Sequence, residues 1–158
     1  MERVPIPKNP ELFDRVISDI QKGLADNLPW LDHSFGRAER LVKSINGKKY
    51  YTPDVYAGGN DYILIAPDDK VLGNFSFFVI DDPQDVDWIT GRQSDYKAQF
   101  SLIVWVDMRR VTNEADNRNT EAVKFQIMRA LNGGFWLKSG SIKTVSYTHL
   151  RAHETPEH

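Results

Sequence analysis

A pair of histidines four residues apart is the first pattern in this sequence that could do chemistry. His149 and His153 would share one face of a helix, where imidazoles at this spacing can hold a metal ion. Both lie in a C-terminal segment that we interpret as foreign to the protein. Apart from them and His158 the only histidine is His33, and a Ser-His-Asp or Cys-His site built around this single loop histidine is improbable. We therefore expect His33 to be a surface or turn histidine.

Two further motifs fall short of the sites that they resemble. The acidic stretch from Asp81 to Asp87 offers oxygen ligands for calcium, but it lacks the Gly and the closing Glu of an EF-hand loop. The stretch from Gly133 to Ser139 has Leu137 where a phosphate-binding loop requires Gly. The chain has no cysteine, which excludes thiolate catalysis and cysteine-ligated zinc. We predict a protein that is not an enzyme, with no catalytic, cofactor-binding or metal-binding residues.

Aromatic and arginine side chains are the candidates for protein contacts. Trp105 lies in a predicted strand and is expected in the core. Trp30, Trp88 and Trp136 flank turns, where an aromatic ring either packs back onto the core or anchors a protein partner. The predicted contact residues are Trp88, Trp136, Arg109, Arg110 and Arg118.

Composition and charge narrow the class of protein. The 158 residues are 41% hydrophobic, which suits a single domain with one core. The net charge is −2, and it becomes −1 when one basic and two acidic residues of the C-terminal segment are set aside. This balance predicts no specific affinity for nucleic acid or for an anionic membrane. No apolar run approaches the roughly 18 residues of a membrane helix, so we expect a soluble protein.

Hydrophobic periodicity predicts a long helix from Pro10 to Asn27. Asn9 would cap it, Pro10 would be its first residue, and Pro29 would stop it. Its apolar stripe consists of Leu12, Phe13, Val16, Ile17, Ile20, Leu24 and Leu28.

Alternating patterns then predict a sheet. Asn46-Gly47 between two alternating runs over 38–56 predicts a β-hairpin with a type I′ turn, and Pro53 predicts that the second strand ends or lies at an edge. Further strands are expected at Tyr62–Ala66 and Phe75–Ile80, with a polar loop over Asp81–Asp95. The strand Tyr96–Val106 is the longest expected. It is apolar on both faces, which predicts a place in the middle of the sheet.

A second helix is expected at Asn119–Asn132, after a loop over Arg109–Arg118, with a buried stripe of Val123, Ile127, Ala130 and Leu131. Strand beginnings follow at Phe135–Leu137 and Ser141–Thr144. The expected fold class is α+β: a mainly antiparallel sheet with a long N-terminal helix, a second helix packed on it, and C-terminal strands cut short.

The segment Val145–His158 is interpreted as a non-native tail. Residues 145–155 match the translation of a transposase-type sequencing-library adapter, beginning GTC TCT TAT ACA CAT CTC. We therefore expect residues 1–144 to be a single truncated α+β domain and exclude residues 145–158 from fold reasoning.

The order of these elements resembles the tail-completion and tail-terminator proteins of long-tailed bacteriophages and prophages. The resemblance rests on the N-terminal helix, on residues 51–58 (YTPDVYAG) leading to a Gly-Asn-Asp turn, on residues 100–107 (FSLIVWVD), and on residues 120–124 (TEAVK). It implies a structural virion component in the tail or neck, assembled in the host cytoplasm. It also implies a homomeric ring that contacts tail-tube or neck proteins, without a cofactor. A cytoplasmic binding module of a mobile element and a small enzyme stay open as alternatives.

Deleting Val145–His158 should leave the melting temperature unchanged, because a translated adapter was never selected to pack against the domain. Thermal melting of the two chains measures this. A loss of several degrees on deletion would show that the tail is structural.

Overall fold

The structure is a computed structural model that describes residues 1–65, 72–88, 94–112 and 120–132. For residues 40–43, 45, 50–52, 81–88, 94–98 and 112 only the backbone is used. The elements are α1 (Phe13–Asn27), β1 (His33–Arg37), β2 (Glu39–Ile45), β3 (Lys48–Gly58), β4 (Asp61–Leu64), β5 (Phe75–Trp88), β6 (Ser94–Trp105), α2 (Met108–Thr112) and α3 (Thr120–Asn132).

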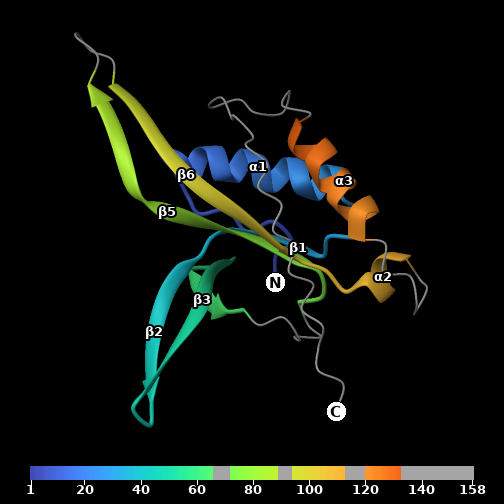
Figure 1. The fold of residues 1–158 in the computed structure, drawn as a ribbon, viewed down its shortest axis with the longest axis horizontal. Helices are drawn as coiled ribbons and strands as arrows, with labels where there is room; N and C mark the ends of the chain where they lie inside the picture. Colours follow the sequence, from blue (N-terminus) through green and yellow to red (C-terminus); the bar gives the residue numbers. More distant parts are fainter. Residues whose placement is uncertain (66–71, 89–93, 113–119, 133–158) are drawn as a thin grey trace.

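Two three-stranded sheets make up the β part of the fold. Sheet A has the order β1-β5-β6, with β1 parallel and β6 antiparallel to β5, and sheet B is the antiparallel set β2-β3-β4. Helices α1 and α3 lie on one side of sheet A, and sheet B extends from the other side (Figure 1). The predicted α+β class is confirmed, with the addition that sheet A is mixed.

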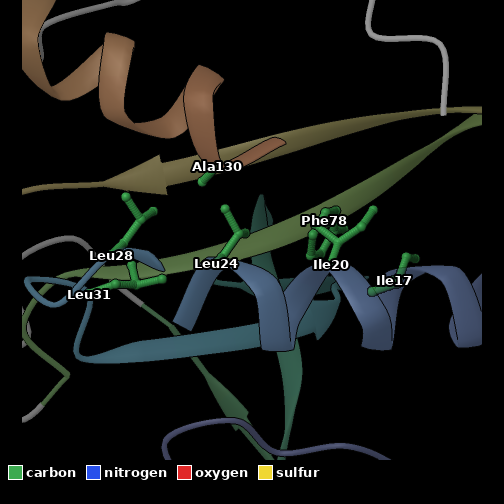
Figure 2. Close-up of a cluster of buried hydrophobic side chains, with 7 residues drawn as sticks. All are labelled: Ile17, Ile20, Leu24, Leu28, Leu31, Phe78 and Ala130. Atoms are coloured by element: carbon green, nitrogen blue, oxygen red, sulfur yellow. The ribbon is translucent and has the colours of Figure 1, made fainter. Parts of the chain in front are cut away.

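The first core cluster lies between the helices and sheet A (Figure 2). Ile20 and Leu24 of α1 are 0% exposed and meet Phe78 of β5 and Ala130 of α3. Burying such an aliphatic side chain contributes about 1.5–3 kcal/mol. Ile127 and Leu131 pack at its margin, so the predicted α3 stripe and its packing on α1 are confirmed.

The second core cluster fills the space between sheet A and sheet B. Phe75 and Phe77 of β5 contact the Trp105 ring edge-on, with centroids 4.9 and 5.6 Å away, and Val55 of β3 joins the same cluster. The expectation that Trp105 lies in the core is confirmed.

The two apolar faces predicted for β6 are also correct, but its predicted central place is wrong. Phe100, Leu102 and Val104 pack on the helix side, and Ile103 and Trp105 pack on the side of sheet B. Among the described strands β6 lies at the edge of sheet A, and β5 is central. Both faces are apolar because a layer covers each side of the sheet, not because strands flank β6. β5, with 14 residues, is longer than the 12 residues of β6.

Helix α1 begins at Phe13, three residues after the predicted start. Asn9 and Leu12 have left-handed backbones, with φ of 52° and 50°, and no side chain caps the helix. The segment before the helix is bonded to β1, since the Ser34 N–H donates to the Arg3 carbonyl at 2.8 Å. Leu12 is 60% exposed instead of belonging to the apolar stripe. The predicted end before Pro29 is confirmed, since the last helical residue is Asn27.

Arg3 forms hydrogen bonds at the C-terminal end of α1. Its guanidinium donates to the carbonyls of Ala25, Leu28 and Leu31 at 3.0 to 3.3 Å. Carbonyls at a helix end lack partners within the helix, and the helix dipole attracts a cation there. Nothing in the sequence pattern indicated this contact, because it joins residues more than twenty positions apart.

The predicted hairpin is confirmed in β2 and β3. Asn46 and Gly47 have φ of 52° and 79°, as a type I′ turn requires. The inference from Pro53 is wrong, because β3 continues to Gly58 and is the central strand of sheet B. The Pro53 carbonyl accepts from the Ile65 N–H at 3.2 Å, so its missing N–H also faces β4, at the point where β4 ends. Pro53 therefore removes no bond between β3 and β2.

The predicted loop over Asp81–Asp95 is wrong. β5 continues to Trp88 and β6 starts at Ser94, so a two-stranded ribbon extends beyond the core (Figure 1). The register shifts between Asp81 and Asp85, where a break in pairing also suits the intervening proline. The predicted loop over Arg109–Arg118 begins instead as α2. The strands expected at Phe135–Leu137 and Ser141–Thr144 lie outside the described residues.

Leu24→Ala should lower the free energy of unfolding by about 2–5 kcal/mol, because it leaves a cavity in the first core cluster. Leu12→Ala is the matched control, since Leu12 is 60% exposed, and it should change stability by less than about 0.5 kcal/mol. Urea unfolding of both variants measures this. Equal losses would contradict the observed helix start.

Candidate protein-interaction surfaces

The residues predicted to make protein contacts do not form one site. Trp88 is the last residue of β5, and Arg109 and Arg110 lie in α2, which follows the end of β6 that pairs with Phe75. They therefore lie at opposite ends of β5 (Figure 1). Trp136 and Arg118 lie outside the described residues.

Arg110 belongs to a network of one ion pair and several hydrogen bonds around Asn74. Its guanidinium lies 3.2 Å from the Asp32 carboxylate, and the same carboxylate accepts from the Asn74 N–H at 2.8 Å. The Asn74 side chain donates to the Trp30 carbonyl and accepts from the Asp107 N–H. Asn74 is 1% exposed, so these bonds join the starts of β1 and β5 to the segment before α2.

Arg109 is exposed, and its backbone N–H is bonded to the Asp107 carboxylate at 3.0 Å. Trp30 packs against the first core cluster and donates its indole N–H to Gln126 of α3 at 2.7 Å. Of the two rings whose side chains are described, Trp30 and Trp105, both pack onto the core.

His33 has a structural place. It is the first residue of β1, half-buried, and its ring is stacked on Phe35 with centroids 5.6 Å apart. Its Nδ1 lies 2.7 Å from the Leu72 carbonyl, which requires that this nitrogen carry the proton. The expectation of a surface or turn histidine is therefore wrong. Within residues 1–65, 72–88, 94–112 and 120–132, no three His, Cys, Asp or Glu side chains gather as metal ligands.

The outer face of sheet B carries exposed aromatic and aliphatic side chains. Val55 and Ile63 pair across β3 and β4 and point to the core, so their neighbours Tyr56, Tyr62 and Leu64 lie on the opposite face. The rings of Tyr56 and Tyr62 meet edge-on at 5.6 Å. Tyr62 is 58% and Leu64 41% exposed. Large apolar side chains gathered on one exposed face are typical of protein contacts.

The register extends this outer face along the hairpin. Positions 50 and 56 share one face of β3, and the residues of β2 and β3 that pair on that face continue it to the turn. These register positions are occupied by Glu39, Leu41, Lys43, Ile45, Lys48, Tyr50, Thr52 and Asp54. Lys48 and Lys49 at the turn are both exposed. The outer face of sheet B therefore carries two acidic positions, 39 and 54, beside Leu64 of β4, and two lysine positions, 43 and 48, toward the hairpin turn.

The β5–β6 ribbon, residues 81–88 and 94–97, has two unlike faces. Opposed residues of an antiparallel pair share a face, so the pairs Asp85–Lys97 and Asp87–Asp95 occupy one side. The pairs Val86–Tyr96 and Trp88–Ser94 occupy the other side. One face is thus charged and mainly acidic, and the other face holds apolar and aromatic positions.

An open depression of about 570 Å³ adjoins sheet B at the turn between β3 and β4. Its lining residues are Met1, Glu2, Ala57, Gly58, Gly59, Asp61 and Ile63. The lining holds two carboxylates and mostly small or apolar groups, which do not make a nucleophile with its base.

The protein should bind no stoichiometric transition metal and show no hydrolytic turnover, because its one histidine outside the tail is held in β1 and it has no cysteine. Elemental analysis of untagged protein without residues 145–158 tests the first part, and a general esterase and phosphatase assay tests the second. One equivalent of zinc per chain would overturn the expectation.

None of the helices in the described parts of the chain is long and apolar enough to cross a membrane. Comparison with known proteins finds no matching family model, no matching curated protein and no matching solved structure.

Proposed function

We propose that this chain is a non-catalytic structural protein that assembles with copies of itself into a ring in the tail or neck of a bacteriophage or prophage particle. The single observation that carries the proposal is the pair of β-structures that extend from the body, each with apolar positions outside both core clusters. Such surfaces suit contacts with other protein chains.

The two surfaces differ from each other, which favours a ring over a symmetric dimer. The outer face of sheet B mixes exposed apolar side chains with acidic and basic positions, whereas the β5–β6 ribbon has apolar positions on one side and mainly acidic positions on the other. A contact between two different surfaces repeats from copy to copy, and it closes into a ring where the rotation between copies allows it.

The resemblance to tail-completion proteins supplies the setting of the proposal. In that setting the ring closes the tail tube, contacts tail-tube or neck proteins, and needs no cofactor. The protein is made in the bacterial host cytoplasm and then becomes part of the virion. The genes beside its own distinguish this setting from a binding module of a mobile element: portal, tail-tube and tape-measure genes support the virion, and metabolic genes contradict it.

The product of the gene free of the adapter sequence should scatter light as an assembly of several copies. Trp88→Ala should weaken the assembly, because Trp88 lies on the apolar side of the ribbon. Phe125→Ala is the matched control: Phe125 is 67% exposed on α3, away from both surfaces, and its loss should change nothing. A protein that stays monomeric at high concentration, also with its tail-tube neighbour present, would contradict the proposed function.

A further inference from the structure

We infer that residues 1–6 form an exchangeable arm: in the assembly, the arm of one copy leaves its own body and binds the same site on the next copy. This inference rests on the proposed self-assembly and identifies a contact that carries it. The occupant of the site is a second copy of this chain, because the site already holds residues 1–6, and an identical arm makes the same contacts.

Polar contacts hold the arm in a defined site. The Arg3 carbonyl accepts from the Ser34 N–H, so the arm lies against β1, which is an edge strand in the described part of sheet A. The Arg3 guanidinium donates to carbonyls at the C-terminal end of α1, and the Gln21 side chain donates to the Pro5 carbonyl at 3.0 Å. Gln21 is 1% exposed, and Pro5 is buried. The site therefore recognises both the backbone and the side chains of this segment.

The link between the arm and α1 is strained. Asn9 has φ of 52°, which asparagine tolerates, but Leu12 has φ of 50°, which is rare for a bulky side chain. The ψ of Leu12 is −121°, whereas the left-handed region covers ψ of roughly +30° to +60°. An arm that binds the next copy lets this link extend, so exchange releases the strain at Leu12.

The link is also free to open. Within the part of the chain that the structure describes, residues 7–10 make no hydrogen bond to the body. Once extended, residues 7–12 span about 20 Å, at roughly 3.3–3.6 Å per residue. Strain in a short link favours exchange of an identical segment between copies, because the bound contacts are kept while the strain is lost.

Exchange of this kind has a direction. The arm and its site are different parts of one copy, so each copy gives its arm to one neighbour and receives an arm from another. A contact between unlike parts repeats from copy to copy and can close into a ring. The exchanged arm therefore suits the proposed ring and needs no pairing of a surface with itself.

Crosslinking between engineered cysteines tests the exchange in the full chain, because the 158 residues include no cysteine. Glu2 of the arm and Asp61 of β4 line the same depression, so Glu2→Cys and Asp61→Cys bring two thiols together when an arm is bound. A size-tagged chain with Glu2→Cys is co-expressed with an untagged chain with Asp61→Cys and treated with a short bismaleimide. A crosslink between tagged and untagged chains reports an arm on another copy. Both substitutions in one chain report an arm on its own body.

The mixed crosslink should exceed that of Glu2→Cys with Phe125→Cys by at least about tenfold, since only a bound arm holds its thiol at the site. Phe125 is the control position because it is 67% exposed on α3, on the other side of sheet A from sheet B (Figure 1).

Substitutions in the link separate strain from side-chain contact. Leu12→Gly should lower the mixed crosslink on the order of tenfold and raise the internal one, because glycine takes a positive φ without strain. Leu12→Ala is the matched control: it removes the same exposed side chain, keeps the strain and should leave the mixed crosslink unchanged. Deleting Lys8 and Asn9 should raise the mixed crosslink, because a shortened link cannot turn back onto its own body. Circular dichroism selects the variants that fold.

Three results would overturn the inference. An internal crosslink without a mixed crosslink above the control would show that each arm stays on its own copy. No crosslink of either kind would show that the arm does not occupy the site. Equal losses in Leu12→Gly and Leu12→Ala would show that strain at Leu12 does not drive exchange. If light scattering still finds assemblies in these cases, self-assembly stands and only the exchange is wrong, whereas monomers throughout contradict both.

Discussion

The fold depends on the first part of β5, residues 75–78, being buried on both of its faces. Phe75 and Phe77 point into the cluster shared with sheet B, and Phe78 points into the cluster under the helices, and all three are at most 2% exposed. Removing either covering layer would leave one face of β5 in water. Each exposed ring would then lose roughly 1.5–3 kcal/mol of stabilisation from burial. The positions of α1, α3 and sheet B follow from this requirement. Hydrogen bonds of Arg3 to the end of α1, and of Asn74 to Trp30 and Asp107, hold the neighbouring segments in place.

Local signals in the sequence predicted the elements better than their arrangement. The stripe of α3 and the Asn46-Gly47 turn depend on neighbouring residues, and both were predicted correctly. The place of β6 in the sheet was predicted wrongly. Two apolar faces indicate that layers cover a strand above and below, but they do not indicate which strands lie beside it. The start of α1 was also missed, because the apolar pattern does not reveal the positive φ of Asn9 and Leu12.

Only some features of the candidate surfaces could be predicted from the sequence. Trp88 was predicted as a contact residue, but its segment was predicted as a loop because aspartates dominate it. The alternation of Asp85, Val86, Asp87 and Trp88 has the period of a strand, and this signal could have identified the ribbon. Tyr62 and Leu64 could not have been identified as exposed, because only the pairing with β3 decides which face of β4 meets the core.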